Sequence, residues 1–512
     1  MISQLPALQV VVPLVCAAGC VLLRSAFGAW LLFSVAATAS LVTAVALTVQ
    51  VWDGDVIRYE MGGWPAPAGI ELVIDQANVV VLLLLGVIAV IAAAYGRRSI
   101  ELEVPLRRIR MFYAAMCLLL TGLFGITVTG DAFNLFVFLE ISSLSSYALI
   151  ALGRRRRALL AAFQYLVIGT VGGTFLLIGV GLAFAVTGTL NMADLADRLP
   201  AVAGNRAVTG AVVFIFVGLA IKMAVFPLHA WLPGAYSEAP SVVSIVLAAV
   251  GTKVAIYAFA RFAFTVFGID VVFTDLPIGE AILVVGSLAM LAGAGVACFQ
   301  QDFKRLLAWS SIGQVGMIVT GIGLATASGV SAAYLHIINH AVIKGALFAA
   351  AGILLIRLGS TSLESMAGLG RRMPLTFGAV VIAGLGLIGV PPTAGFASKW
   401  ALASALVEDD RWLILIVMLA SSLLAMVYVG RIVEVGWFRA PADLDEKTAE
   451  NVDRATAGAN PGVVRVREQT SLLMAGPVAL LAVASVYFGI DASLPSSLAD
   501  GAARILTGGG AP

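Results

Sequence analysis

The chain has 512 residues, of which 61% are hydrophobic and only 12% are charged, and its mean hydropathy is +1.02. A water-soluble globular protein does not bury that much apolar surface, so the composition predicts an all-α polytopic membrane protein. The formal net charge of +2 says little, because the charges are sorted by loop. We expect no nucleic-acid partner, no soluble catalytic domain and therefore no enzyme.

The four cysteines all lie in apolar runs, without a C-x-x-C motif or a cluster with histidine. This pattern argues against a haem, zinc or iron–sulfur site, so we expect no metal and no cofactor in this chain. The first apolar run begins near Leu5 without a preceding basic region, and we expect it to remain as a membrane span rather than to be cleaved.

Apolar segments long enough to cross the hydrocarbon core recur along the whole chain and predict about fourteen spans. They lie at 5–23, 28–51, 75–95, 111–130, 132–152, 160–188, 208–230, 241–262, 277–299, 306–326, 331–356, 376–405, 411–434 and 471–490. Between the second and third spans, residues 52–74 alternate around Gly62-Gly63 and predict a small exterior hairpin. Residues 438–469 are polar and basic, which predicts a cytoplasmic loop able to meet partners. We expect the tail after residue 500 to be weakly ordered.

Charge alternates from loop to loop. The odd-numbered loops carry the basic residues Arg24; Arg97, Arg98, Arg107, Arg108 and Arg110; Arg154 to Arg157; Lys304 and Arg305; Arg357, Arg371 and Arg372; and Arg431 onward. The even-numbered loops are short or acidic, with Asp53, Asp55 and Glu60; Asp131; Asp194 and Asp197; Asp270 and Asp275; and Glu408, Asp409 and Asp410. Loop seven is the exception, because it holds Glu238 and no Lys or Arg. By the positive-inside rule the pattern places both termini on the exterior side.

The stretch from Val217 to Arg261 carries the strongest functional signal. Two apolar runs each hold one lysine, Lys222 and Lys253, and a segment rich in Pro, His and Gly separates them. A charged side chain at bilayer depth costs a few kcal/mol and is rarely kept without a partner or a role. Interrupted helices at that depth line a cavity or are buried in protein. The stretch therefore predicts an ion path.

Glu140 is the acidic group at similar depth. It follows Asp131 by nine residues, which places it ~13 Å into its span. A carboxylate there must be protonated or paired, and we expect it to pair with Lys222. The pair is either sensitive to a proton on a neighbouring group or a static ion pair, and the sequence leaves both interpretations open.

His336, His340 and Lys344 recur at i, i+4 and i+8, so they share one helical face with about 6 Å between successive residues. One water bridges such a step, and an imidazole accepts a proton on one nitrogen while it donates from the other. The pattern favours a proton relay over structural hydrogen bonding, and it argues against a metal site because two histidines at this spacing lack further ligands.

Lys399 follows the sequence Gly389-Val-Pro-Pro-Thr-Ala-Gly395 in the twelfth span. Its side chain faces either the internal path or an exit to water. The alternative interpretation is that it snorkels to the membrane interface. His229 and Glu238, in the first break, either admit protons from the cytoplasm or brace a loop end. Each half of the chain thus has a Pro-broken apolar segment with a lysine, which suggests an internal repeat.

Together these residues resemble a known superfamily. The segment FPLHAWLPGAYSEAPS, with Lys222 before it and Lys253 after it, resembles the antiporter-like proton-pumping subunits shared by Mrp cation/proton antiporters, respiratory complex I and membrane-bound hydrogenases. The run GDAFNLFVFLEISSLSSYALIALG looks most like the D-type member of the multi-subunit Mrp Na+/H+ antiporter. The similarity covers roughly residues 75 to 435.

The resemblance implies a fold with two inverted five-helix repeats, each containing a broken helix. The expected divisions are 1–110 (three spans and the hairpin), 111–262 (first repeat), 277–435 (second repeat) and 436–512 (loop, last span and exterior tail). It also implies proton-transfer roles for Glu140, Lys222, Lys253, His340, Lys344 and Lys399, whereas His336 is placed there by helical spacing.

Two functions follow from the resemblance. The first is a proton-translocating subunit of a multi-subunit monovalent cation (Na+)/proton antiporter in the plasma membrane, with other membrane subunits, H+, the cation and the bilayer as partners. The alternative is a proton-pumping membrane subunit of a redox-driven complex, in which electron transfer in other subunits drives the same residues. A weaker third interpretation is a passive scaffold whose buried charges are structural.

Overall fold

The computed structural model describes residues 4–153, 156–440 and 471–508, and they fold almost entirely into helices. The helices are α1 (Leu5–Leu22), α2 (Ala26–Gln50), α3 (Gln76–Glu103), α4 (Ile109–Val128), α5 (Ala132–Ala151), α6 (Arg156–Thr187), α7 (Met192–Arg198), α8 (Arg206–Met223), α9 (Leu232–Glu238), α10 (Ser241–Val246), α11 (Thr252–Arg261), α12 (Ile278–Phe299), α13 (Phe303–Gly323), α14 (Ala327–Leu358), α15 (Leu369–Arg372), α16 (Pro374–Ile388), α17 (Ala394–Glu408), α18 (Trp412–Val433), α20 (Leu472–Ile490) and α21 (Ser493–Thr507). The strands are β1 (Ile57–Glu60) and β2 (Glu71–Ile74). The expected loop at 438–469 lies almost wholly outside the described residues.

Helices suit this composition because the bilayer interior offers no water to satisfy backbone N–H and C=O groups, so each span must bond them internally. Polar side chains mark where several helices begin: Asp75, Asp131, Asp302 and Thr326 each accept a hydrogen bond from a backbone N–H of the first turn. The prediction of an all-α polytopic membrane protein is confirmed.

The described residues contain thirteen helices that are long and apolar enough to cross a membrane, compared with about fourteen expected spans. The difference lies at 376–405, which is not one helix but two, α16 and α17. Gly389 ends α16 with φ of 89°, and Pro391 and Pro392 lack the N–H groups that a continuing helix needs. The span expected at 208–230 is likewise interrupted, because α8 ends at Met223 and the left-handed Ala224 follows it.

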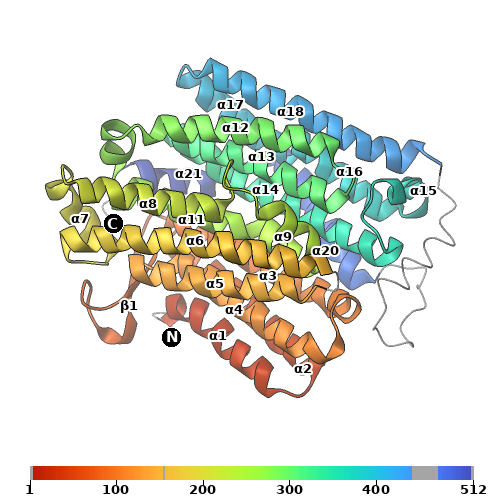
Figure 1. Ribbon diagram of the computed structural model, residues 1–512, viewed down its shortest axis with the longest axis horizontal. Coiled ribbons are helices and arrows are strands. Elements are labelled where there is room, and N and C mark those ends of the chain that lie inside the picture. The colour runs from red at the N-terminus through yellow and green to blue at the C-terminus, as the bar shows by residue number, and fades with distance from the viewer. Residues whose placement is uncertain (1–3, 154–155, 441–470, 509–512) are drawn as a thin grey trace.

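The long helices form one bundle around α14, which packs against α3, α10, α13, α16, α17, α20 and α21. In Figure 1, α1, α2 and α4 make up the lower part of the bundle, α6 and α8 cross the middle, and α12, α17 and α18 lie in the upper part. The helices differ in how much of their apolar stretch is buried: the buried share is 94% for α13 and 28% for α18 with its extension to Phe438. The outer helices therefore present apolar surface to lipid or to neighbouring subunits.

A short antiparallel hairpin follows α2. Its strands pair with Ile57 opposite Ile74 and Glu60 opposite Glu71, within the range where the alternation predicts one. Glu71 is buried, accepts a hydrogen bond from Asn191 (2.8 Å) and pairs with Arg58 (3.1 Å). The hairpin thereby ties the α4–α5 turn and the loop before α7 to one end of the bundle.

The expectation that the tail after residue 500 is weakly ordered is wrong for residues 501–507, which belong to a helix that begins at Ser493. This helix, α21, packs against α14 and α3 and buries Ala499, Ala502 and Leu506. Ser331 on α14 donates a hydrogen bond to Asp500 (2.5 Å). Small residues allow the close approach, because the alanines bring one face of the helix against α14 with little side-chain volume between them.

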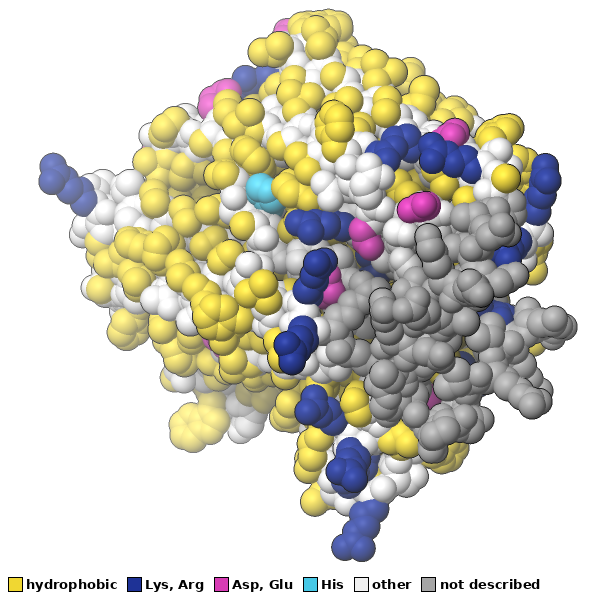
Figure 2. All heavy atoms as spheres, turned by 45° about the vertical axis from the view of Figure 1, so that its right-hand side comes forward, with side chains coloured by type: hydrophobic (Ala, Val, Ile, Leu, Met, Phe, Trp, Pro, Cys, Tyr) yellow, Lys and Arg dark blue, Asp and Glu magenta, His cyan; other side chains and the backbone are white. Residues whose placement is uncertain are grey.

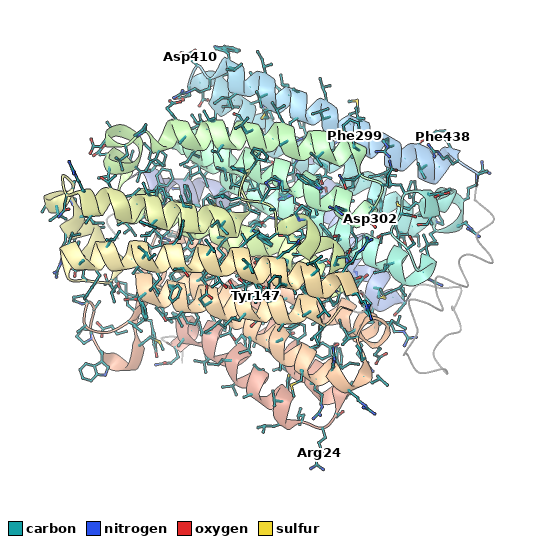
Figure 3. All side chains as sticks on the ribbon, in the orientation of Figure 1. Arg24, Tyr147, Phe299, Asp302, Asp410 and Phe438 are labelled. Carbon is teal, nitrogen blue, oxygen red and sulfur yellow. The ribbon has the colours of Figure 1, made fainter. Side chains whose placement is uncertain are left out.

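Basic side chains gather at one end of the bundle. Figure 2 shows a row of Lys and Arg side chains beside the grey residues, and in Figure 3 Arg24 projects from the turn between α1 and α2. Arginines also occur near the end of α3, at the ends of α15 and α18, and at the start of α6. This distribution matches the alternation of charge between the loops of the sequence.

Candidate functional site

Glu140 and Lys222 lie together in the structure. Glu140 Oε1 is 3.8 Å from Lys222 Nζ, and Lys222 also donates a hydrogen bond to Ser143 Oγ at 2.7 Å. Glu140 and Ser143 are three residues apart on α5, so one face of that helix holds both partners of the lysine. At an effective dielectric constant of about 20, two unit charges at this distance attract by about 4 kcal/mol.

The neighbouring helix α6 makes room for the carboxylate. A Cβ on Gly173 would overlap Glu140 Oε1, and this oxygen has no hydrogen-bond partner among the described residues. The Glu140 side chain is 25% exposed, whereas that of Lys222 is 6% exposed. Glu140 thus lies at the surface of the folded chain, between the buried lysine and the lipid or protein that contacts α5 in the membrane.

Lys222 occupies the last turn of α8, just before the break. The free carbonyls at a helix C-terminus carry partial negative charge, which favours a cation there. The Trp231 indole donates a hydrogen bond to the carbonyl of Ile221 (2.9 Å) and satisfies one of these groups. Trp231 stacks on Tyr165 with ring centroids 3.8 Å apart, and Tyr165 contacts Tyr147 edge-on at 4.7 Å. Figure 3 shows Tyr147 near the middle of the bundle.

Lys253 lies in the first turn of α11, which follows a π-helical turn at Leu247–Gly251. A π turn shifts the backbone hydrogen bonds by one residue and frees a carbonyl. Lys253, which is fully buried, donates to the carbonyl of Ala248 (2.5 Å), and Tyr236 donates to the carbonyl of Leu247 (2.7 Å). The turn packs against α14, so Lys253 lies between α8 and the histidine helix.

His336 and His340 stack on the buried face of α14, with centroids 5.9 Å apart and ring planes 4° apart. His336 is hydrogen-bonded at both nitrogens, to Ser398 Oγ and to Gln314 Oε1, each at 2.9 Å. His340 is fully buried, and neither ring nitrogen has a partner among the described residues. Two positive charges at this separation repel by about 3 kcal/mol at an effective dielectric constant of about 20, so the pair disfavours double protonation.

Lys344 and Lys399 also lack a carboxylate partner in the described structure. Lys344 donates to the Leu307 carbonyl (2.8 Å) and to Ser310 Oγ (2.5 Å) on α13. Lys399 donates to two carbonyls at the end of α16, those of Leu387 (2.7 Å) and Ile388 (2.9 Å), and to Ser422 Oγ (3.0 Å). Lys399 is 7% exposed, so it faces the interior and does not snorkel.

Of the two residues expected in the first break, His229 is buried and Glu238 is partly exposed. The His229 ring stacks on Phe226 (centroids 5.1 Å apart) and contacts Trp309 edge-on (5.0 Å), and its Nδ1 has no described partner. Glu238 ends α9, and its Oε2 likewise has no described partner. Neither side chain makes a capping hydrogen bond in the described structure, so the bracing interpretation gains no support there.

Outside the spans, Asp131 caps α5 and accepts a hydrogen bond from the backbone N–H of Asn134 (2.7 Å). Burial raises the pKa of this carboxyl, and the N–H groups of Asn134 and Phe133 oppose that effect. Among the described residues no group of three or more His, Cys, Asp or Glu side chains is placed to hold a metal ion.

The structure brings the expected residues onto neighbouring parts of the bundle. α5 meets α8 through the Glu140–Lys222 pair, α8 packs against α11, the π turn before α11 packs against α14, and α14 packs against α13 and α17. Sequence reasoning did not identify the neutral partners of these groups, which are Ser143, Ser310, Gln314, Ser398 and Ser422. The spacing of Ser143 from Glu140, and the position of Ser398 next to Lys399, were the available signals. Hydroxyl and amide groups that solvate buried ammonium and imidazole groups let a proton move without an unsatisfied charge.

A family model described as NADH:quinone oxidoreductase/Mrp antiporter, TM matches residues 129–425. The N-type subunit of NADH-quinone oxidoreductase from Desulforudis audaxviator is 40% identical over 96% of each chain. The D-type subunit of the Na(+)/H(+) antiporter from Alkalihalophilus pseudofirmus is 34% identical over 77% of this chain and 78% of its own.

A chain in the structure of the Mrp complex from Dietzia sp. superimposes with a TM-score of 0.87 at 28% identity, covering 100% of this chain and 98% of that one. The resemblance inferred from the broken-helix motifs is thereby confirmed. This chain belongs to the family of membrane subunits shared by NADH:quinone oxidoreductases and Mrp antiporters.

Proposed function

We propose that this chain is the proton-translocating subunit of a multi-subunit monovalent cation/proton antiporter, with Na+ as the expected cation. The observation that carries the proposal is the series of ionisable groups Glu140, Lys222, Lys253, His336, His340, Lys344 and Lys399 on neighbouring parts of the bundle, all of them buried except the partly exposed Glu140. Five buried cationic or imidazole groups beyond the single ion pair are costly to keep in a membrane without use.

Coupling in this proposal is electrostatic. Lys222 is held by about 4 kcal/mol of attraction to Glu140, so the charge on either partner alters the free energy of the proton on the other. A proton that arrives at Lys253 or His340 adds a like charge along the same line and repels the next. Proton movement through the chain thereby changes the field felt by a cation elsewhere in the complex.

The partial exposure of Glu140 supports the presence of a neighbouring subunit. Glu140 is 25% exposed in the chain alone, and a carboxylate that faces lipid at this depth costs several kcal/mol. A neighbouring membrane subunit that covers α5 and α6 removes that cost. The antiporter relative is itself named as one subunit, and the superimposed chain comes from a complex. We further propose a plasma-membrane location with both termini on the exterior side, from the loop charges.

The direct test uses everted membrane vesicles that contain the assembled complex. Glu140→Ala, Glu140→Gln and Lys222→Ala are expected to abolish Na+-driven dissipation of a proton gradient while the other subunits still copurify with the tagged chain. Glu434→Gln removes an exposed carboxylate 2.9 Å from Arg439 and serves as the matched control with normal transport. Normal antiport in an assembled Glu140 or Lys222 variant would overturn the proposal.

A second candidate is a proton-pumping subunit of a redox-driven complex. The observation in its favour is the relative named as an NADH-quinone oxidoreductase subunit, which matches over 96% of both chains. Purification of the tagged chain in mild detergent separates the two. Small membrane proteins without flavin or iron–sulfur absorbance support the antiporter, whereas copurifying flavin or iron–sulfur subunits support the redox pump.

The scaffold interpretation is tested by the double variant Lys222→Ala/Lys344→Ala. If the buried lysines are only structural, an assembled double variant keeps its transport. Our proposal expects the activity to be lost.

A further inference from the structure

A column of polar side chains extends from Lys253 along α11. Lys253, Tyr257 and Arg261 occur at i, i+4 and i+8, so they share one face of the helix with about 6 Å of rise between successive residues. Arg261 Nε donates a hydrogen bond to the Tyr257 hydroxyl at 3.2 Å, and the guanidinium lies 5.4 Å from the centre of the Tyr257 ring. The column therefore runs from the middle of the bundle to the end of α11.

An ion pair terminates the column. Arg261 Nη2 contacts both carboxylate oxygens of Asp75, at 2.8 and 2.7 Å, and the two side chains are only 11% and 5% exposed. Asp75 also caps α3, where Oδ1 accepts from the N–H groups of Ala77 and Asn78. Capping needs one acceptor oxygen, and Asn or Ser supplies one as well. A buried ion pair is on balance neutral for stability compared with apolar side chains, so stability alone does not account for it.

A polar cavity adjoins this end of the bundle. Its volume is about 260 Å³, and its lining includes Gln76, the residue after Asp75, together with Thr48 on α2 and Asp500 and Arg504 on α21. Both Asp500 and Arg504 are exposed, so the cavity reaches the surface, and its volume holds several waters at about 30 Å³ each. α21 packs on α3 and on the π turn after Arg261, and the cavity that it lines extends to Gln76, one residue from Asp75.

We propose that Tyr257, Arg261 and Asp75 form a proton-transfer branch between Lys253 and this cavity, an inference that rests on the proposed function. A proton leaves the Lys253 ammonium group through one bridging water and reaches the Tyr257 oxygen as the hydroxyl's own proton passes toward the Asp75 carboxylate. Asp75 then releases a proton to cavity water, so Tyr257 and Asp75 end in the protonation states in which they began, and the net result is one proton moved from Lys253 to the cavity. Arg261 stays charged throughout and is a positioning residue, because a guanidinium does not deprotonate in proteins.

The surrounding groups are consistent with this division of roles. The titratable and charged residues that face the branch are Lys253 on α11 itself, Tyr334 on α14, and Asp500 and Arg504 across the cavity on α21. The described structure places no second carboxylate against Arg261, so Asp75 is its counter-ion.

The test compares two tyrosine variants in the assembled complex. Tyr257→Phe removes one hydroxyl and keeps the ring. Tyr113→Phe is the matched control, because Tyr113 is also buried and donates one hydrogen bond to a backbone carbonyl, that of Gly96 (3.1 Å). Measured quantities are the maximal antiport rate per copurified complex, the half-saturating Na+ concentration, and the ratio of rates in H2O and D2O.

We expect Tyr257→Phe to lower the maximal rate at least about tenfold and to raise the H2O/D2O ratio, while half-saturating Na+ changes less than about twofold. Tyr113→Phe is expected to match the unmodified complex in all three. A normal rate in Tyr257→Phe, or a lowered rate with an unchanged isotope ratio, would overturn the branch, because a merely structural loss does not make proton transfer slower than the other steps.

A charge-neutral variant keeps the proposal testable if Tyr257→Phe fails to assemble. Asp75→Asn/Arg261→Gln removes both charges together, so neither is left unpaired, and the asparagine still caps α3. The same loss of rate and rise in isotope ratio are expected, and full activity would overturn the branch. Glu140→Gln is assayed in parallel: if it transports normally the proposed function fails, whereas if it is inactive and the branch variants are normal, only the branch fails.

Discussion

The carboxylate of Glu140 occupies the space that a Cβ on Gly173 would take. The two residues lie on adjacent helices, α5 and α6, which pack against each other. The absence of a side chain at Gly173 thus sets how close the Glu140 carboxylate comes to Lys222.

Gly173→Ala is expected to displace the carboxylate. A shift of about 1 Å away from Lys222 lowers the attraction by about 1 kcal/mol, which corresponds to about a fivefold change in the coupled equilibrium. We expect a transport rate reduced by about that factor in everted vesicles. Gly181→Ala, on the same helix with open space around its Cβ, is the control, and equal rates in the two variants would contradict the prediction.

The two histidines of α14 are expected to respond differently to leucine. His340→Leu removes two nitrogens that have no described partner, so the thermal midpoint of the complex should stay the same or rise, while transport is lost. His336→Leu leaves Ser398 and Gln314 without their partner and should cost about 1–3 kcal/mol. Thermal unfolding of the purified complexes measures both. A lower midpoint for His340→Leu than for His336→Leu would show this account to be wrong.

Gly389→Ala is expected to destabilise the second break. Gly389 has φ of 89°, and an added Cβ would lie 2.8 Å from Lys399 Cδ. The left-handed backbone alone costs a non-glycine residue about 1–2 kcal/mol, and the contact pushes Lys399 from the carbonyls of Leu387 and Ile388. Thermal unfolding should show a lower midpoint than for Gly378→Ala, a glycine on α16 with open space around it. Identical midpoints would argue against this geometry.

Trp231→Phe is expected to loosen the first break without disturbing its stacking. The phenyl ring still lies on Tyr165, but the Ile221 carbonyl loses its donor next to Lys222. An unsatisfied buried carbonyl costs about 1–3 kcal/mol, so the thermal midpoint should fall. Trp400→Phe, at a side chain that is 65% exposed, is the comparison and should change the midpoint little. A fall of the same size in both would contradict the role of the indole N–H.

Much of the site was predictable because a charged residue within a long apolar run is recognisable from the sequence alone. Lys222, Lys253, His340, Lys344 and Lys399 stand out in apolar runs whatever the helices pack against. The pairing of Glu140 with Lys222 was expected and is found at 3.8 Å. The relay interpretation of these groups remains the proposal tested above.

The partners of those groups were not predictable. Lys253 donates to a carbonyl that a π turn frees, and Arg261 pairs with Asp75 from a helix 186 residues earlier in the chain. The helix α21 also escaped prediction, because its short run of alanine and glycine looks disordered until α14 supplies a surface. Each of these features depends on how helices rotate and approach one another.

The sequence by itself thus determined the helical class, most of the spans, the basic end of the bundle and the list of ionisable residues within the spans. The physical reason is that a bilayer requires internal backbone hydrogen bonds and penalises charge, and both demands act on each segment separately. Only the tertiary structure decided which hydroxyl, carbonyl or carboxylate meets each ionisable group. Apolar helix surfaces are nearly interchangeable to lipid, so close packing at small residues such as Gly173 and Ala499, and not hydropathy, selects those neighbours.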